Sequence, residues 1–170
     1  MAWCVAQMNY SSYKPIKAHP SANFFPGKVA PGAMFISKVV HISHHQISNQ
    51  LIPVVAKLDY SSPWSKNLYS TGLYAQAGQY IEVTVPDILI GKKGVVQIGI
   101  HADNLGKWVA VTEARRRMPL VVKITKVTTK VLLINSAFGG LVYLAADPKS
   151  ALWEADIKIS RAIHRPYLKL

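Results

Sequence analysis

Hydrophobic and polar positions alternate along most of the chain, which is the pattern of half-buried β-strands. In Tyr80–Val85, isoleucine and valine at every second position face one way while tyrosine, glutamate and threonine face the other. The same alternation recurs in Val95–His101 and around Ile157 and Ile159. Further strands are expected at Met34–Ile42, Leu51–Leu58, Pro119–Val127, Thr129–Ile134 and Leu141–Ala145.

Turn signals separate these runs. Tyr13–Pro31 carries four prolines and predicts an extended or turning loop. Polar or glycine-rich stretches predict turns at Ser43–Asn49 and Asn135–Gly140, and a hairpin connection at Ile88–Gly94. Helical periodicity is weak everywhere, and Lys107–Arg117 is the one modest candidate for a helical turn.

Strand-forming residues and closely spaced turns together indicate the fold class. β-branched and aromatic residues dominate the runs, and turns recur about every ten residues. We therefore predict an all-β fold, an antiparallel β-sandwich of roughly 8–10 strands with little helix. A chain of 170 residues fits one such domain over residues 1–170, with residues 1–23 as an extended N-terminal segment.

The expected compartment follows from what the sequence lacks. Cys4 is the single cysteine, so no internal disulfide framework is possible, and we expect it to be a small buried hydrophobe. The first residues lack the basic and continuous apolar regions of a secretory signal, and no apolar run approaches the roughly 18–20 residues of a membrane span. An intracellular location is the expectation.

Charge narrows the class of partner. The chain has 20 lysines and arginines against 8 acidic residues, a formal net charge of +12, which favours an acidic protein, nucleic acid or an anionic membrane surface. The candidate contact residues are the cluster Arg115, Arg116 and Arg117. Lys92 and Lys93, a second basic pair elsewhere in the sequence, are also candidates. An RNA-recognition run is missing, and arginine forks bind carboxylates bidentately, so an acidic protein is favoured over nucleic acid.

Catalytic patterns are not found. The sequence has no H-E-x-x-H, no G-x-S-x-G and no phosphate-binding loop. His41, His44 and His45 suggest a metal site, but no carboxylate or thiolate lies near them in sequence, and a solvated turn is favoured. His101 and Asp103 could pair as a base and its orienter, although no nucleophile accompanies them. We expect no enzyme activity, no cofactor and no metal.

Five blocks arrive in an order that resembles a known family. They are "FFPGKV" at Phe24–Val29, "STGLYAQAGQYIEVTVP" at Ser70–Pro86, "VQIGIHADNL" at Val96–Leu105, and later "RRRMPL" and "FGGLVYL". Together they resemble the N-terminal β-sandwich region of enhancin-like, mucin-type zinc metallopeptidases and of the related TRP-channel-associated factors. The resemblance spans roughly Phe24–Tyr143 and rests on the order of several blocks.

The resemblance implies that "STGLY" shapes the sandwich, with Trp64 and Tyr74 packing, and that it is not a ligand site. In these peptidases H-E-x-x-H lies in a later domain, and this chain lacks it, so the resemblance implies no peptidase activity here. The ending "HRPYLKL" reads as a finishing strand and tail, which slightly favours a free-standing domain over a fragment of a larger peptidase.

The main prediction is a non-catalytic scaffold that docks on an acidic partner within a larger assembly, such as a tubulin lattice or an RNA-containing particle. One alternative is an accessory domain of a mucin-type metallopeptidase. Another is a carbohydrate-binding module in which Trp64, Tyr74 or Trp108 stacks on sugar rings.

Overall fold

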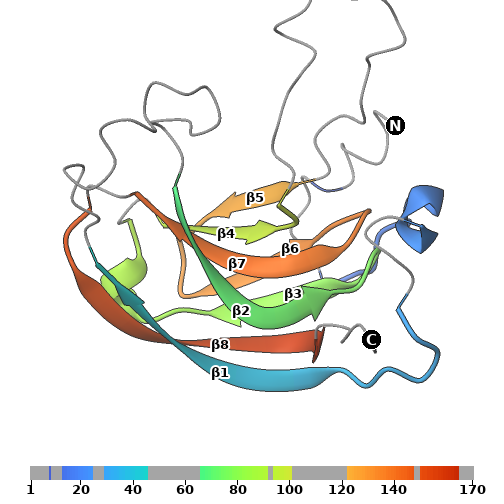
Figure 1. Cartoon of the computed structure of the whole chain (residues 1–170), viewed down its shortest axis with the longest axis horizontal. Helices are drawn as coiled ribbons and strands as arrows, with labels where there is room; N and C mark the ends of the chain where they lie inside the picture. Colours follow the sequence, from blue (N-terminus) through green and yellow to red (C-terminus); the bar gives the residue numbers. More distant parts are fainter. Residues whose placement is uncertain are drawn as a thin grey trace, which may run out of the picture.

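The chain is antiparallel and all-β in the computed structural model, which describes residues 8, 13–24, 29–45, 66–91, 94–100, 122–147 and 150–164 (Figure 1). The eight strands in this part are β1 (Ile36–His44), β2 (Asn67–Ala75), β3 (Tyr80–Thr84), β4 (Val95–Ile98), β5 (Lys123–Lys126), β6 (Val131–Asn135), β7 (Gly140–Ala146) and β8 (Trp153–His164). Helix in the same residues is limited to the short 3-10 turns η1 (Pro20–Asn23) and η4 (Asp87–Leu89). The predicted fold class is confirmed.

The strands form two layers that share one strand. β1, β8, β3 and β6 are hydrogen-bonded in that order, and β5, β4, β7 and β2 form the other layer. The last residues of β8 leave the first layer, because Leu73 of β2 pairs with His164 and Tyr74 pairs with Ile163. β8 therefore joins the two layers at one corner, and the hydrogen-bonded strands follow one continuous path from β5 to β6, with β1 paired to β8 off that path.

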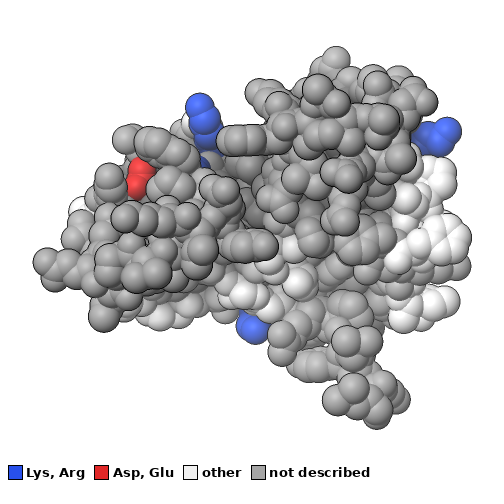
Figure 2. Space-filling model, turned by 45° about the horizontal axis from the view of Figure 1, so that its top comes forward, with Lys and Arg blue, Asp and Glu red and all other residues white. Residues whose placement is uncertain are grey.

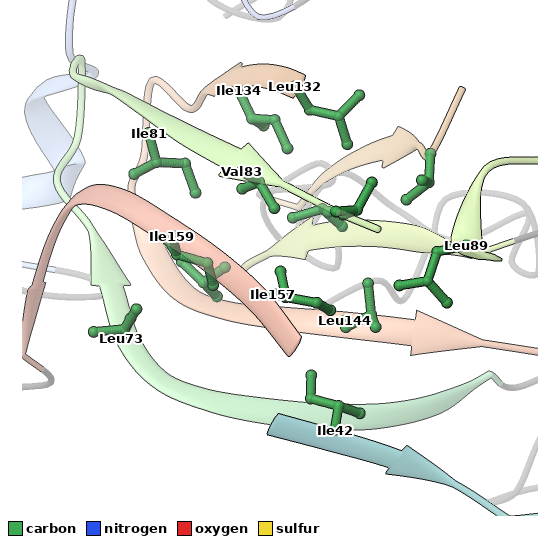
Figure 3. Close-up of a cluster of buried hydrophobic side chains, with 14 of the residues drawn as sticks. Ile42, Leu73, Ile81, Val83, Leu89, Leu132, Ile134, Leu144, Ile157 and Ile159 are labelled. Carbon is green, nitrogen blue, oxygen red and sulfur yellow. The ribbon is translucent and has the colours of Figure 1, made fainter. Parts of the chain in front are cut away.

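The core lies between the layers (Figure 3). Ile157 and Ile159 of β8 and Val83 of β3 project from one layer, and Leu144 of β7 and Val96 of β4 come from the other. All of these side chains are buried. The alternation read from the sequence is thus the alternation between this core and the outer faces.

A bulge bends β2. In β2, Ser70 pairs with Tyr143 and Tyr74 with Leu141, so the intervening β2 residues exceed those of β7. Gly72 sits in this bulge with φ 70°, and the Thr71 hydroxyl donates to the carbonyl of Val142 at 2.7 Å. "STGLY" is therefore a bulged strand that bends the layer, as the resemblance implied.

An N-terminal segment docks on two turns, the one between β2 and β3 and the one after β6. The Ile16 amide donates to the carbonyl of Gly78 and the His19 amide to that of Ala137, both at 2.8 Å. The His19 ring lies 5.0 Å from the ring of Phe138, which is itself buried with Ile16 and Met8 in a second apolar cluster. The part of the proline-rich loop that precedes η1 thus packs against these turns.

Several sequence expectations need correction. The Ile88–Gly94 hairpin is wrong, because β3 and β4 belong to different layers and this segment crosses between them. The turn expected at Ser43–Asn49 starts too early, because β1 continues through His44. β2 was not predicted as a strand of its own, since its bulge breaks the alternation.

Three expectations, Cys4, Leu51–Leu58 and Lys107–Arg117, lie outside the described residues. Among the residues that are described, no helix has the length and apolar character needed to cross a membrane.

Candidate binding surface

Most of the predicted contact residues lie outside the part of the chain that the structure describes. These are Arg115, Arg116, Arg117, Lys92, Lys93, Trp64 and Trp108, and also His101 and Asp103. Tyr74 is described, lies in β2 and is 5% exposed. Burial raises the pKa of its phenol. A ring this buried offers no open face to a sugar, which counts against a sugar-stacking role for Tyr74.

The structure instead gathers aromatic rings around an arginine that the sequence analysis missed. The guanidinium carbon of Arg161 lies 4.3 Å from the centre of the Tyr80 ring and 5.5 Å from that of Phe35. Tyr13 meets Tyr80 edge-on, with ring centres 5.8 Å apart. We call Tyr13, Phe35, Tyr80 and Arg161 the Arg161 platform. It lies on the outer face of the layer containing β8, on the side away from the core.

Arg161 occupies a strained position in a bulge. Ile36 of β1 pairs with Ala162 of β8, but Lys38 pairs with Ile159, so β8 has an extra residue here. Arg161 has φ 60° and is the one non-glycine residue with positive φ in the described part of the chain. For a side chain other than glycine, this conformation costs about 1–2 kcal/mol.

The bulge explains the bend of β8 but does not explain why an arginine occupies position 161. It redirects the end of the strand toward β2, and glycine at this position would take the same φ without steric cost. Stacking on exposed rings returns about 0.5–1 kcal/mol per contact, which offsets part of the strain. A signal was present in the sequence: the apolar alternation through Ile157 and Ile159 slips by one residue at Ser160-Arg161 before Ala162.

Charges of both signs share this outer face. Glu154 and Asp156 of β8 face outward, as does Glu82 of β3, and Lys158 stands between them in the pairing. The described part of this face is therefore of mixed charge. Figure 2 brings another side of the molecule forward, and the few described lysine and arginine side chains visible there lie apart from one another.

One of the three histidines singled out in the sequence, His41, contacts a carboxylate of β8, and a second, His45, is linked to another carboxylate only through Ser43. His41 Nδ1 lies 2.8 Å from Asp156 Oδ1, and both side chains are more than 60% exposed. The Ser43 hydroxyl donates to Glu154 at 3.0 Å and lies 2.8 Å from His45 Nε2. The statement that no carboxylate lies near these histidines holds in sequence but is wrong in space. Even so, no group of three or more possible ligands is placed to hold a metal among the described residues.

The third histidine, His44, is fully buried and is not part of a solvated turn. Its Nδ1 lies 2.7 Å from the Tyr69 hydroxyl and its Nε2 lies 2.9 Å from the Ser150 hydroxyl. The ring stacks on Trp153 at 5.3 Å, and Tyr69 meets both rings edge-on.

The hydrogen-bond directions in this cluster follow from the donors available. The Ser150 hydroxyl donates to the carbonyl of Asp147 at 2.7 Å, so it accepts from the Nε2–H of His44. Nδ1 then accepts from the Tyr69 hydroxyl. Because the Ser150 hydroxyl donates to the carbonyl of Asp147, its contact with His44 is part of a buried hydrogen-bond network that holds the end of β1 against β8.

Glycines from three of the sequence blocks behind the family resemblance lie in close backbone contact at one end of the sandwich. They are Gly78, Gly99, Gly139 and Gly140. A Cβ added at Gly139 would lie 2.7 Å from the carbonyl oxygen of Ala75, and one at Gly140 would lie 2.9 Å from the backbone of Gly99. The Gly78 amide donates to the carbonyl of Ser136 at 2.8 Å. The blocks therefore maintain close backbone packing, which is a structural role.

Comparisons with known proteins agree with this geometry. Residues 54–160 match the family described as the N-terminal domain of M60-like peptidases. TRPM8 channel-associated factor 1 of Homo sapiens is 31% identical over 121 residues, covering 69% of this chain and 12% of that protein. A TRPM8 channel-associated factor homolog of Danio rerio is 28% identical over 123 residues, covering 72% of this chain and 13% of that protein.

A solved structure shares the fold. IMPa from Pseudomonas aeruginosa, in complex with an O-glycopeptide, superposes with a TM-score of 0.51 at 13% identity, covering 92% of this chain and 15% of that one. The chain thus spans about an eighth of the curated relatives it matches. The resemblance seen in the sequence is confirmed, and the chain belongs to the family of N-terminal domains of M60-like peptidases.

Proposed function

We propose that this chain is a non-catalytic β-sandwich that docks on an acidic protein partner within a larger assembly. The observation that carries the proposal is the formal net charge of +12 on 170 residues. A charge of this size attracts acidic surfaces and speeds association with them.

Two further observations support a binding role. The human relative is named as a channel-associated factor, which is a description of association with another protein. In addition, His44 and Ser150 belong to a buried hydrogen-bond network, which is a structural role. The candidate basic contacts remain Arg115, Arg116 and Arg117 with Lys92 and Lys93.

The test is an affinity pull-down of the tagged full chain from its own cells at low salt, with a salt-elution series and mass spectrometry. We expect one acidic assembly in fixed stoichiometry that is released as salt rises, because salt screens exposed charges. Retention of the partner at high salt would contradict the electrostatic part.

A matched pair of variants separates the arginine cluster from net charge. Replacement of Arg115, Arg116 and Arg117 by glutamine lowers the charge by three, as does replacement of Lys38 and Lys126 together with Lys158, which are exposed. Loss of partner only in the arginine variant would identify the cluster as the contact. Equal loss in both would assign binding to overall charge.

A second candidate is an accessory N-terminal domain of a longer M60-like peptidase. The family match favours it, because that family is described by its place in a peptidase. Sequencing of the full transcript tests this candidate. A downstream H-E-x-x-H in the same reading frame is the expected result, and a stop codon after Leu170 would rule it out. If the pull-down recovers glycoproteins that salt does not release, the carbohydrate-binding alternative replaces the proposal.

A further inference from the structure

The Arg161 guanidinium is held by ring stacking, and its N–H groups have no partner within the part of the chain that the structure describes. The rings are those of Tyr80 and Phe35. An arginine stacked by its flat face keeps its N–H edge free in the plane of the group. That edge matches the two oxygens of a carboxylate.

The strain at Arg161 indicates that its side chain is used. The bend of β8 needs a residue at positive φ, and glycine would supply it without strain. Strained residues that keep their side chains cluster at binding sites, because the surroundings hold them in place for contact. The bulge directs both Ser160 and Arg161 to the outer face, so the guanidinium faces solvent.

The surroundings of the guanidinium resemble a protein interface. Phe35 is 44% exposed and Tyr13 is 65% exposed, and Met34, adjacent to Phe35 in the chain, is also exposed. Aromatic residues, methionine and arginine are the types enriched at the centre of protein–protein contacts.

A nucleic-acid partner fits this face less well. A phosphate backbone carries a negative charge at every nucleotide, and Glu82, Glu154 and Asp156 on the same face would repel it. The face of the Tyr80 ring is already covered by Arg161, so no base can stack there. A protein segment tolerates the mixed charges, since only one carboxylate has to meet the arginine.

We propose that the Arg161 platform binds one glutamate or aspartate side chain, flanked by aromatic and uncharged residues, on the protein partner. This inference rests on the proposed function and names a contact for it, separate from the arginine cluster. The carboxylate accepts two hydrogen bonds from Arg161, while apolar groups of the segment cover Phe35 and Tyr13.

Fluorescence anisotropy with a defined probe tests the contact. The probe is a blocked peptide with a single glutamate beside phenylalanine and uncharged residues, carrying an uncharged dye, compared with the same peptide in which glutamine replaces the glutamate. Oligothymidine with the same dye is the nucleic-acid probe. The full chain is measured as wild type, Arg161→Gly, Arg161→Lys and Lys158→Gln, the last a control that removes an exposed cation from the same face of β8.

We expect the wild type to prefer the glutamate peptide, and Arg161→Gly to bind it about fivefold or more weakly. Arg161→Lys should also bind more weakly, because an ammonium group lacks the planar fork. Lys158→Gln should stay within about twofold of wild type. A thermal melt of Arg161→Gly verifies folding, which glycine at positive φ favours.

The proposal is overturned if the wild type binds the glutamate and glutamine peptides equally, or if Lys158→Gln and Arg161→Gly lose affinity for the glutamate peptide equally. It is also overturned if Arg161→Gly loses more affinity for oligothymidine than for the glutamate peptide. Repeating the pull-down with Arg161→Gly separates the two claims. If that variant recovers the acidic assembly as well as wild type does, the proposed function stands and the Arg161 platform is not its contact.

Discussion

At the scale of single residues, contact with neighbouring backbone decides which positions accept a side chain. Gly72 and Gly139 both have φ 70°, yet a Cβ meets nothing within 4 Å at Gly72 and meets the backbone of Ala75 and Ala77 at Gly139. The two glycines therefore separate conformational strain from steric clash, which a sequence cannot do.

Replacement of each glycine by alanine tests this separation. Gly72→Ala should lower the free energy of unfolding by about 1 kcal/mol, the cost of positive φ alone. Gly139→Ala should lower it by at least about 2 kcal/mol more, because backbone atoms cannot move aside cheaply. Urea denaturation measures both values, and equal losses would contradict the close packing of the glycine blocks.

Arg161 predicts an unusual order of stability within a strand. Arg161→Ala loses the stacking on Tyr80 and Phe35 and keeps the strain, whereas Arg161→Gly loses the stacking and releases the strain. The glycine variant should therefore be more stable than the alanine variant by about 1 kcal/mol, although glycine normally weakens strands. Thermal and urea denaturation compare the two. An alanine variant as stable as the glycine variant would show that position 161 is not strained.

Tyr74 predicts a loss of stability in alkali. Burial raises its pKa above 10.0 in the folded protein, so the unfolded chain loses the phenol proton first as pH rises. The contribution of Tyr74 to the free energy of unfolding is therefore fully present below about pH 10 and is lost as pH rises through the raised pKa of the folded state. Lys123 has the opposite effect. Burial lowers its pKa from 10.5, which disfavours the folded state while the amine is charged, so this cost to the free energy of unfolding becomes smaller as pH rises toward 10.5.

The free energy of unfolding of Tyr74→Phe and wild type should be compared at pH 9 to 11 by urea denaturation. We expect the difference between them to shift toward the variant above about pH 10. A difference that is constant with pH would refute the burial of an ionisable phenol at this position.

At the scale of elements, the order of pairing brings distant polar residues together. β1 ends beside the start of β8, so His44 meets Trp153 and Ser150 although more than 100 residues separate them. His41, three positions earlier, lies on the outer face against Asp156. One strand thus presents a structural histidine inward and a solvated histidine outward.

His44→Ala and His41→Ala test this difference. His44→Ala should destabilise the fold by about 3 kcal/mol, because it leaves a cavity beside Trp153 and removes a buried hydrogen-bond partner of the Tyr69 hydroxyl. His41→Ala should cost less than about 1 kcal/mol, since its ion pair is exposed. Comparable losses, measured in guanidinium, would mean that His44 is not the buried centre of a network.

At the scale of the whole molecule, β8 couples the two layers. It pairs with β1 and β3 in one layer and with β2 in the other, and its apolar side chains enter the shared core. Loss of either layer would expose the other face of that core. The layers should therefore unfold together.

Native-state hydrogen exchange measures this coupling. The most protected amides of β3 and of β4, which lie in different layers, should report the same free energy of opening. Gly139→Ala, a change at the edge of one layer, should lower both values equally. Separate values for the two strands would mean that each layer is its own folding unit.

The sequence by itself determined most of the strands. β3, β4 and most of β8 were predicted from apolar residues at every second position, and β1, β5, β6 and β7 from runs of strand-forming residues between turn signals. The family was also determined by sequence, since five blocks in a fixed order carry the resemblance, and Gly78, Gly139 and Gly140 in these blocks leave no room for a Cβ. Bulged β2 escaped because a bulge disturbs the only periodic signal available.

Only the tertiary structure decided which strands are neighbours and what their outer faces carry. The pairing of β1 and β3 with β8 joins Phe35, Tyr80 and Arg161, and places His41 beside Asp156. No local pattern records these meetings, because residues that touch across strands are distant along the chain. The net charge follows from composition alone. The position of Arg161, whose N–H groups are unpaired among the described residues, depended on how β8 bends.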